Sequence, residues 1–474
     1  MPLDQNGRTA PLIVAVSLFM ENMDSTVIAT SLPAIARDIG TNPLALKLAV
    51  TSYLLSLAIF IPASGWTADR FGARNVFRIA IAVFILGSIG CALSHSLTDF
   101  VAARIFQGIG GAMMTPVGRL IVVRSIDKSL LLNAMSLLTI PALIGPICGP
   151  PLGGFITTYA TWHWIFIINV PIGLVGIVLA TRFIPDIRAQ YPYPFDLVGF
   201  ILSGVAIGGL SFGLSVMGLA FLPDGAVAAL IGVGTVSGIA YVYYALRAPA
   251  PILDLRLLKR PTFRASIYGG FMFRLGVGAL PFLLPLLLQL GFGLSPFQSG
   301  LITFTSALGS MFMKAAATTI LKHFGYRKVL LYNSLVSAVF IGACASFIQG
   351  MPFAAMIAIL LTGGFFRSLQ FTSVNTIAYA EIDAPVMSRA TSMVAAFQQL
   401  SLSTGVAVGA LIVELTLRLK HSTAMGITDF PPAFLVLSVL SAAAALIFMQ
   451  MPADAGAELS GRQVAQPAIS EKRA

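Results

Sequence analysis

Charged residues are scarce in this chain: only 10% of its 474 residues are Asp, Glu, Lys or Arg, against roughly 25% in an ordinary soluble domain. Hydrophobic residues make up 57%. So few charges cannot coat a soluble surface, and apolar runs long enough to cross a bilayer recur from one end of the chain to the other. The composition excludes a soluble globular protein and predicts a single all-α membrane domain.

Cysteine pairs, metal-binding spacings and nucleotide-binding loops are missing too. The three cysteines, Cys91, Cys148 and Cys344, lie far apart within apolar runs, which argues against a disulfide framework. The four histidines lack the i, i+4 spacing of a zinc site, and no Lys follows a Gly, so the phosphate-binding P-loop is absent. We therefore expect no enzymatic activity, no metal site and no cofactor. Without ATP as a direct energy source through this loop, any transport would be driven by an ion gradient or by the substrate's own gradient.

Apolar windows of about twenty residues predict fourteen transmembrane helices. Their expected ranges are 11–32, 45–64, 76–94, 98–123, 132–157, 164–183, 197–218, 226–246, 264–290, 297–320, 329–349, 353–376, 389–415 and 431–451.

An internal repeat predicts how these helices are grouped. The hexapeptide at 69–74 (DRFGAR) is echoed at 322–327 (KHFGYR), an offset of 253 residues. This offset is longer than six helices, so it predicts a 6+2+6 plan with pseudo-two-fold related halves. The expected units are a six-helix bundle at 1–190, two inserted helices and a linker at 191–260, a second bundle at 261–452, and a disordered cytoplasmic tail at 453–474.

The positive charges predict the orientation, because Lys and Arg in short loops resist translocation. Of the 29 Lys and Arg residues, 21 fall on the side shared with the amino terminus and four on the other side: Arg37, Lys47, Arg418 and Lys420. This bias predicts both termini in the cytoplasm of a bacterial-type inner membrane. Since the basic residues are dispersed rather than clustered in one patch, no nucleic-acid partner is expected.

Six ionisable residues fall inside predicted helices, where charge is costly and usually functional or paired. Glu21 and Asp24 lie one turn apart on the first helix. Asp24 lies roughly 12 Å and Arg104 roughly 9 Å below the outer ends of their helices, so the two are candidate partners. This pair could be a static link between helices or a titrating site; we favour proton coupling by Asp24, Glu21 and Arg104.

The other three buried charges, Arg274, Lys314 and Arg367, are all positive and lie in the second half. Arg274 and Arg367 could pair with Glu21 across a cavity or bind an anionic substrate group, and Lys314 could extend toward the cytoplasmic surface. We expect Arg274 and Arg367 to line the substrate cavity, together with Gln107 and Asn22.

Glycines recur every four residues in the fifth predicted helix, at Gly145, Gly149 and Gly153, which predicts a ridge that another helix can approach closely.

Four motifs together resemble the major facilitator superfamily, and within it the fourteen-helix drug:proton antiporters. They are a first-helix signature (Asp24, Thr26, Leu32, Pro33), a loop signature (Gly65, Asp69, Arg70, Gly72, Arg74), a helix-four signature (Arg104, Gln107, Gly108) and an antiporter signature (Gly145, Gly149, Pro150, Gly153, Gly154).

The resemblance implies a major facilitator fold and proton-coupled export of a small amphipathic molecule by alternating access. It also implies that the loop signature braces the cytoplasmic gate, that the antiporter signature allows helix movement and that Arg104 tunes proton coupling. The alternative is a symporter or facilitator of a small organic anion, to which the second-half arginines would be suited. The expected partners are the substrate, protons and the bilayer, and a periplasmic adaptor is a further candidate.

Overall fold

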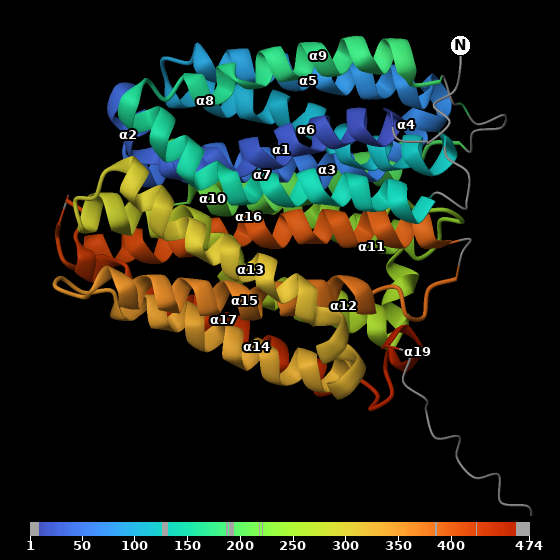
Figure 1. Ribbon diagram of the computed structural model, residues 1–474. Helices are drawn as coiled ribbons and strands as arrows, with labels where there is room; N and C mark the ends of the chain where they lie inside the picture. The colour runs from blue at the N-terminus through green and yellow to red at the C-terminus, as the bar shows by residue number, and fades with distance from the viewer. Residues whose placement is uncertain are drawn as a thin grey trace, which may run out of the picture.

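The computed structural model describes residues 9–125, 131–185, 188, 194–217, 219, 221–383, 386–422 and 424–460. Throughout this part of the chain the regular structure is helical, as the sequence predicts. The long helices run side by side along one axis, with the first half of the chain above the second half (Figure 1). The amino terminus and residues 461–474 of the predicted tail lie outside the described residues, and Ala457–Ser460 forms the short helix α19.

The first half contains α1 to α9. These helices are α1 (Thr9–Val27), α2 (Leu32–Asp38), α3 (Lys47–Phe60), α4 (Ser64–Phe71), α5 (Ala73–Ala92), α6 (Leu97–Ser125), α7 (Leu131–Tyr159), α8 (Trp164–Ile167) and α9 (Asn169–Phe183). Within this half, α1 packs along α7, and α5 packs along α6.

The second half contains α12 to α18, and two helices lie between the halves in sequence. The inserted helices are α10 (Leu197–Val216) and α11 (Asp224–Ala245), which pack on each other. The second half is α12 (Pro261–Leu286), α13 (Pro296–Phe324), α14 (Tyr326–Ala343), α15 (Phe353–Ile377), α16 (Met387–Leu419), α17 (Pro431–Ala442) and α18 (Ala444–Phe448).

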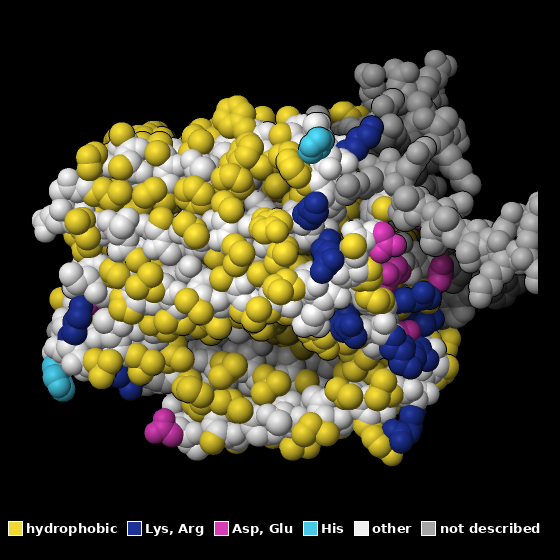
Figure 2. Space-filling view, turned by 90° about the horizontal axis from the view of Figure 1, so that it is seen from below, with side chains coloured by type: hydrophobic (Ala, Val, Ile, Leu, Met, Phe, Trp, Pro, Cys, Tyr) yellow, Lys and Arg dark blue, Asp and Glu magenta, His cyan; other side chains and the backbone are white. Residues whose placement is uncertain are grey.

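Twelve helices in the described part of the chain are long and apolar enough to cross a membrane. They correspond to twelve of the fourteen predicted ranges. The other two ranges coincide with α7 and α13, which are each 29 residues long but are not among those twelve. Hydrophobic side chains cover the middle of the face shown in Figure 2, and Lys and Arg side chains gather toward one end. The chain is therefore a multi-pass membrane protein.

The predicted sequence repeat has the same backbone conformation in both halves. Gly72 ends α4 with φ 90°, and Gly325 ends α13 with φ 77°. A side chain at either position would be strained, because positive φ is readily adopted only by glycine. Each glycine thus produces the sharp turn between consecutive helices at the equivalent point of its half.

The hydrophobic core shows where the two halves meet. One cluster contains Val27 and Leu32 of the first half together with Leu283 and Phe434 of the second. Two other clusters belong almost entirely to one half each, and they include the Gly72 and Gly325 ends of the bundles. We call the end with the shared cluster the sealed end, and the end with Asp69 and Arg124 the basic end.

Polar contacts between the halves also concentrate toward the sealed end. Gln289 donates a hydrogen bond to the Thr30 carbonyl (2.8 Å), and the Phe297 amide donates to Thr158 Oγ1 (3.1 Å). α7 packs along α13 and α3 packs along α16. These contacts hold the halves together on one side of the cavity described below.

Candidate functional site

A buried ion pair occupies the middle of the first half. Asp24 on α1 is fully buried, Arg104 on α6 is 1% exposed, and Arg104 Nη1 lies 2.7 Å from Asp24 Oδ2. The pairing predicted from their matched depths is therefore present. Removing two charges from water is costly, and such a pair persists where further hydrogen bonds satisfy its remaining polar atoms.

Those hydrogen bonds come from two neighbouring helices. Gln107 Nε2 donates to Asp24 Oδ1 (3.0 Å), and Asn169 Nδ2 of α9 donates to the same oxygen (2.8 Å). Both amides also donate to Ser88 Oγ of α5, at 2.8 and 3.3 Å. Two helices, α6 and α9, therefore bind the carboxylate that α1 carries, and α5 contributes Ser88 to the same hydrogen-bond network, which we call the Asp24 network.

Gln107 is a correction to the sequence analysis, which placed it in the substrate cavity. Its side chain is fully buried and bonded to Asp24 and Arg104, because it lies one turn along α6 on the same face as the arginine. Asn169 and Ser88 were missed by the sequence analysis. The available signal was their polarity within otherwise apolar helices, which does not distinguish a functional partner from a side chain bonded to its own helix.

Arg104 connects the Asp24 network to a cavity between the halves. Its guanidinium carbon lies 4.1 Å from the centroid of the Tyr53 ring, and both residues line a cavity of about 270 Å³ that also contains Glu21 and Asn22. Glu21 is half-buried and accepts a hydrogen bond from Thr115 Oγ1 (2.6 Å). The two predicted carboxylates thus differ in environment, since Glu21 faces the cavity and Asp24 lies behind its wall.

A second cavity of about 630 Å³ adjoins the first, because Thr26, Ala29, Val277 and Pro281 line both. Its walls come from α1 and α7 on one side and α12, α13 and α15 on the other. This size suits a drug-sized ligand. We call the two together the central cavity.

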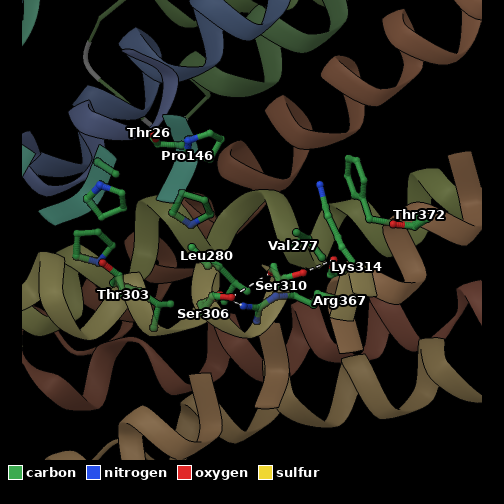
Figure 3. A pocket seen from close by; sticks show the side chains of 18 of the residues that line it. Thr26, Pro146, Val277, Leu280, Thr303, Ser306, Ser310, Lys314, Arg367 and Thr372 are labelled. Atoms are coloured by element: carbon green, nitrogen blue, oxygen red, sulfur yellow. Dashed lines mark hydrogen bonds between the residues drawn. The ribbon is translucent and has the colours of Figure 1, made fainter. Parts of the chain in front are cut away.

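The second-half cations lie in or just behind the wall of the central cavity. Arg367 lines it and donates a hydrogen bond to Ser306, and Lys314 lines it from α13 (Figure 3). Arg274, predicted to line the cavity, lies behind its wall: it is 1% exposed and donates to Asn375 Oδ1 (2.6 Å). No ion pair joins these three cations to a carboxylate within the described residues.

The predicted gate residues form contacts within the first half. Asp69 Oδ1 lies 2.7 Å from Arg124 Nη1, and Arg74 donates to the Ile184 carbonyl (3.4 Å). Gly72 forms the turn between α4 and α5, whereas Gly65 and Arg70 are exposed. Asp69 therefore links α4 to α6, and Arg74 links α5 to the residue that follows α9, at the basic end.

The glycine ridge of α7 packs against two different neighbours. A Cβ atom at Gly145 would lie 3.1 Å from the Met23 amide nitrogen, and one at Gly153 would lie 2.8 Å from Thr30 Oγ1, both in the first half. Gly149 faces Thr26 in the same way, whereas at Gly154 the Cβ would lie 2.8 Å from Phe297 Cα of the second half. Pro150 meets the second half through its carbonyl, which lies against Gly300. The predicted close approach is thus present and includes the interface between the halves.

Two helical bundles that enclose a central cavity, with buried charges around it, define a membrane transporter of the two-bundle class. Comparison with known proteins agrees: the chain matches the Major Facilitator Superfamily over residues 14–196 and 267–473. The chain belongs to this superfamily.

The similarity to known proteins and to a solved structure covers nearly the whole chain. A protein of Salmonella paratyphi A, provisionally named multidrug resistance protein MdtD, is 37% identical over 95% of this chain and 96% of its own length. The protein of the same name from Escherichia coli O6:H1 is 38% identical over 93% of this chain and 94% of its own length. The crystal structure of a D-xylose–proton symporter shares the fold, with a TM-score of 0.68, 14% identity, and coverage of 94% of this chain and 98% of that one.

Proposed function

We propose that this protein is a multidrug-type exporter that exchanges a small amphipathic molecule for protons by alternating access. The observation that carries the proposal is the Asp24 network, a buried carboxylate paired with Arg104, which itself lines the central cavity. The relatives provisionally named as multidrug resistance proteins support the export of drug-like compounds.

In this proposal the structure represents a state that is closed toward the outside. The halves are joined at the sealed end, which we assign to the outer face, and the basic end is cytoplasmic, with both termini there. The Lys- and Arg-rich end of Figure 2 supports this orientation. The proposal also includes an inner-membrane location and fourteen membrane-spanning helices. In it, α7 and α13 cross the membrane in addition to the twelve long apolar helices described above.

Protonation of Asp24 would be the coupling step. A neutral Asp24 no longer holds the Arg104 guanidinium by charge, so Arg104 becomes free to alter its contacts at the wall of the central cavity. Glu21, in the cavity itself, is the second candidate carrier. Exchange becomes obligatory if proton and substrate binding exclude each other. No cofactor is required, because the proton gradient supplies the energy, and a periplasmic adaptor remains a candidate partner.

The alternative is a symporter or facilitator of a small organic anion. It is favoured by Arg274, Lys314 and Arg367, which form no ion pair with any carboxylate in the described part of the chain. The fold does not decide between them, because the similar xylose transporter is a proton symporter.

The direction of coupling is measured in proteoliposomes that hold the purified protein under an imposed pH gradient. Export predicts that a dye-like substrate moves against the proton flux and that substrate addition releases or consumes protons in a fixed ratio. Movement of substrate and protons in the same direction would refute export and support the alternative.

A further inference from the structure

The two walls of the central cavity carry opposite charge. Glu21 lies on the first-half wall, and Lys314 and Arg367 lie on the second-half wall. Among the described residues, no Asp or Glu lines the larger cavity and no Lys or second-half Arg lines the smaller one. Arg104 also lines the smaller cavity, but its charge is paired with Asp24. Among the described residues, the cavity charges without an ion-pair partner are therefore Glu21 on one wall and Lys314 and Arg367 on the other.

Most donor groups of Arg367 have no hydrogen-bond partner among the described residues. A guanidinium has five N–H donors, whereas the Arg367 side chain donates to the uncharged hydroxyl of Ser306. The residue is only 8% exposed. A charge in this position is costly unless an anion or several acceptors complete it, which makes Arg367 suited to bind an acceptor that enters the cavity.

Lys314 adds a second, mobile cation to the same wall. It lies two turns along α13 from Ser306, the hydrogen-bond partner of Arg367, and its amine extends into the pocket in Figure 3. Ser310 and Asn375 provide further polar groups nearby. A carboxylate or another anionic group held here would contact both Arg367 and Lys314.

Glu21 completes the arrangement on the opposite wall. Glu21 accepts a hydrogen bond from Thr115, a neutral donor, and no cation of the described residues forms an ion pair with it. Arg119 acts on it electrostatically from beyond ion-pair distance. Apolar and aromatic side chains, including Leu57, Leu280 and Phe371, line the cavities around these polar groups. A ligand that matches this cavity has an apolar body and charged groups at separate ends.

We propose that the exported substrate is an amphipathic zwitterion, with a cationic group bound at Glu21 and an anionic group bound at Arg367 and Lys314. This inference rests on the proposed export function and assigns its substrate class. It also explains why proton binding and substrate binding exclude each other, because the cationic group of the substrate and a proton compete directly for Glu21. A purely anionic substrate would instead favour a protonated Glu21 and would move together with the proton.

The test measures equilibrium binding to the purified protein, without any gradient, for probes that differ only in charge. The zwitterions are para-aminomethyl benzoic acid and its biphenyl homologue, which span two lengths. Their methyl esters are cations and their N-acetyl derivatives are anions. At one length or both, the zwitterion is expected to bind about tenfold more tightly than either derivative, because each derivative loses one charge-assisted contact.

Variants assign each charge to its wall. Arg367→Gln should abolish the advantage of the zwitterion over the ester, and Lys314→Gln should reduce it; Glu21→Gln should abolish the advantage over the N-acetyl compound. Lys259→Gln, an exposed Lys outside the cavity, is the matched control and should change neither. Arg367→Lys, which keeps the charge, should retain part of the preference and so separates loss of charge from loss of fold.

The inference is overturned if neither zwitterion binds, if neither binds better than its derivatives, or if the preference survives both Glu21→Gln and Arg367→Gln. These outcomes are independent of the coupling assay. Binding of the zwitterion without proton exchange would refute the proposed function and leave this inference standing. Proton-driven export of cations alone would refute this inference and leave the proposed function standing.

Discussion

Lys47 Nζ of α3 lies 3.6 Å from Glu414 Oε2 of α16, so an ion pair joins the two halves at the sealed end. The Lys47 side chain is fully buried, and Glu414, which is 13% exposed, also binds Arg418 at 2.8 Å. The charge pattern predicts Lys47 on the outer side but does not predict its partner. Lys47 begins α3 and is covered by α16, a contact between segments more than 350 residues apart.

Breaking the Lys47–Glu414 pair should loosen the sealed end. Glu414→Gln leaves the buried Lys47 charge uncompensated, so we expect lower thermal stability and more of the protein with its halves separated at this end. A cysteine at Thr30, which is buried there, reports the change by its labelling with a membrane-impermeant maleimide, in a background without Cys91, Cys148 and Cys344.

The charge-swapped protein, Lys47→Glu with Glu414→Lys, should restore protection of that cysteine at least in part. Asp99→Asn, an exposed change on α6, is the control. Equal labelling of the wild type and Glu414→Gln would contradict a role for the pair in closing the sealed end.

Asp24→Asn should uncouple transport from protons. The substitution keeps the size of the side chain and its ability to accept from Asn169, but it removes the titrating charge paired with Arg104. We expect uptake driven by a pH gradient to fall at least tenfold, while exchange of labelled for unlabelled substrate without a gradient continues. Unchanged gradient-driven transport, measured in the same vesicles, would exclude Asp24 as the coupling carboxylate.

Adjacent glycines of α7 should respond differently to the same substitution. Gly153→Ala forces a contact with Thr30 within the first half, whereas Gly154→Ala forces one with Phe297 of the second half. We expect Gly153→Ala mainly to lower the melting temperature, because neighbours inside one bundle must shift. Gly154→Ala should mainly increase maleimide labelling at Thr30Cys. The same response from both variants would show that the interface at Gly154 does not separate during transport.

Acid should weaken the link between the inserted segment and the second half. Asp254, before α12, is buried and accepts hydrogen bonds from Arg256 (2.7 Å) and Arg389 of α16 (3.3 Å). Burial raises the pKa of Asp254, but the hydrogen bonds from the two arginines outweigh it and hold the pKa below its usual value of 3.8. A lowered pKa stabilises the fold above the usual value, and this stabilisation disappears as the pH falls through the folded-state pKa.

Asp254→Asn should therefore lower the free energy of unfolding by about 1 kcal/mol near neutral pH and by progressively less below about pH 4. Melting curves of both proteins across this range check the prediction. Asp383→Asn, which alters a carboxylate in an exposed pair with Arg260, is the control. The prediction would be contradicted if the difference in stability between the wild type and Asp254→Asn did not shrink in acid.

The fold was predictable from the sequence because its signals are local and strong. Apolar stretches identified every long helix to within a few residues, including α7 and α13, since the bilayer imposes a length on each hydrophobic run. The repeat at 69–74 and 322–327 identified the two halves, and the motifs identified the superfamily. The buried charges were recognised for the same reason, because ionisable side chains stand out against an apolar background.

The arrangement of those charges was decided only by the tertiary structure. Helical periodicity gives depth along a helix but not which neighbour each face meets, so it suggested the Asp24–Arg104 pair and missed Asn169 and Ser88. It also misplaced Gln107 in the cavity and gave no partner for Lys47. Long-range packing places Gln107 in the Asp24 network, covers Lys47 with α16 and sets Glu21 on the opposite wall from Arg367. The reason is that the partner of a side chain within the membrane depends on which helices pack together and not on its position along the chain.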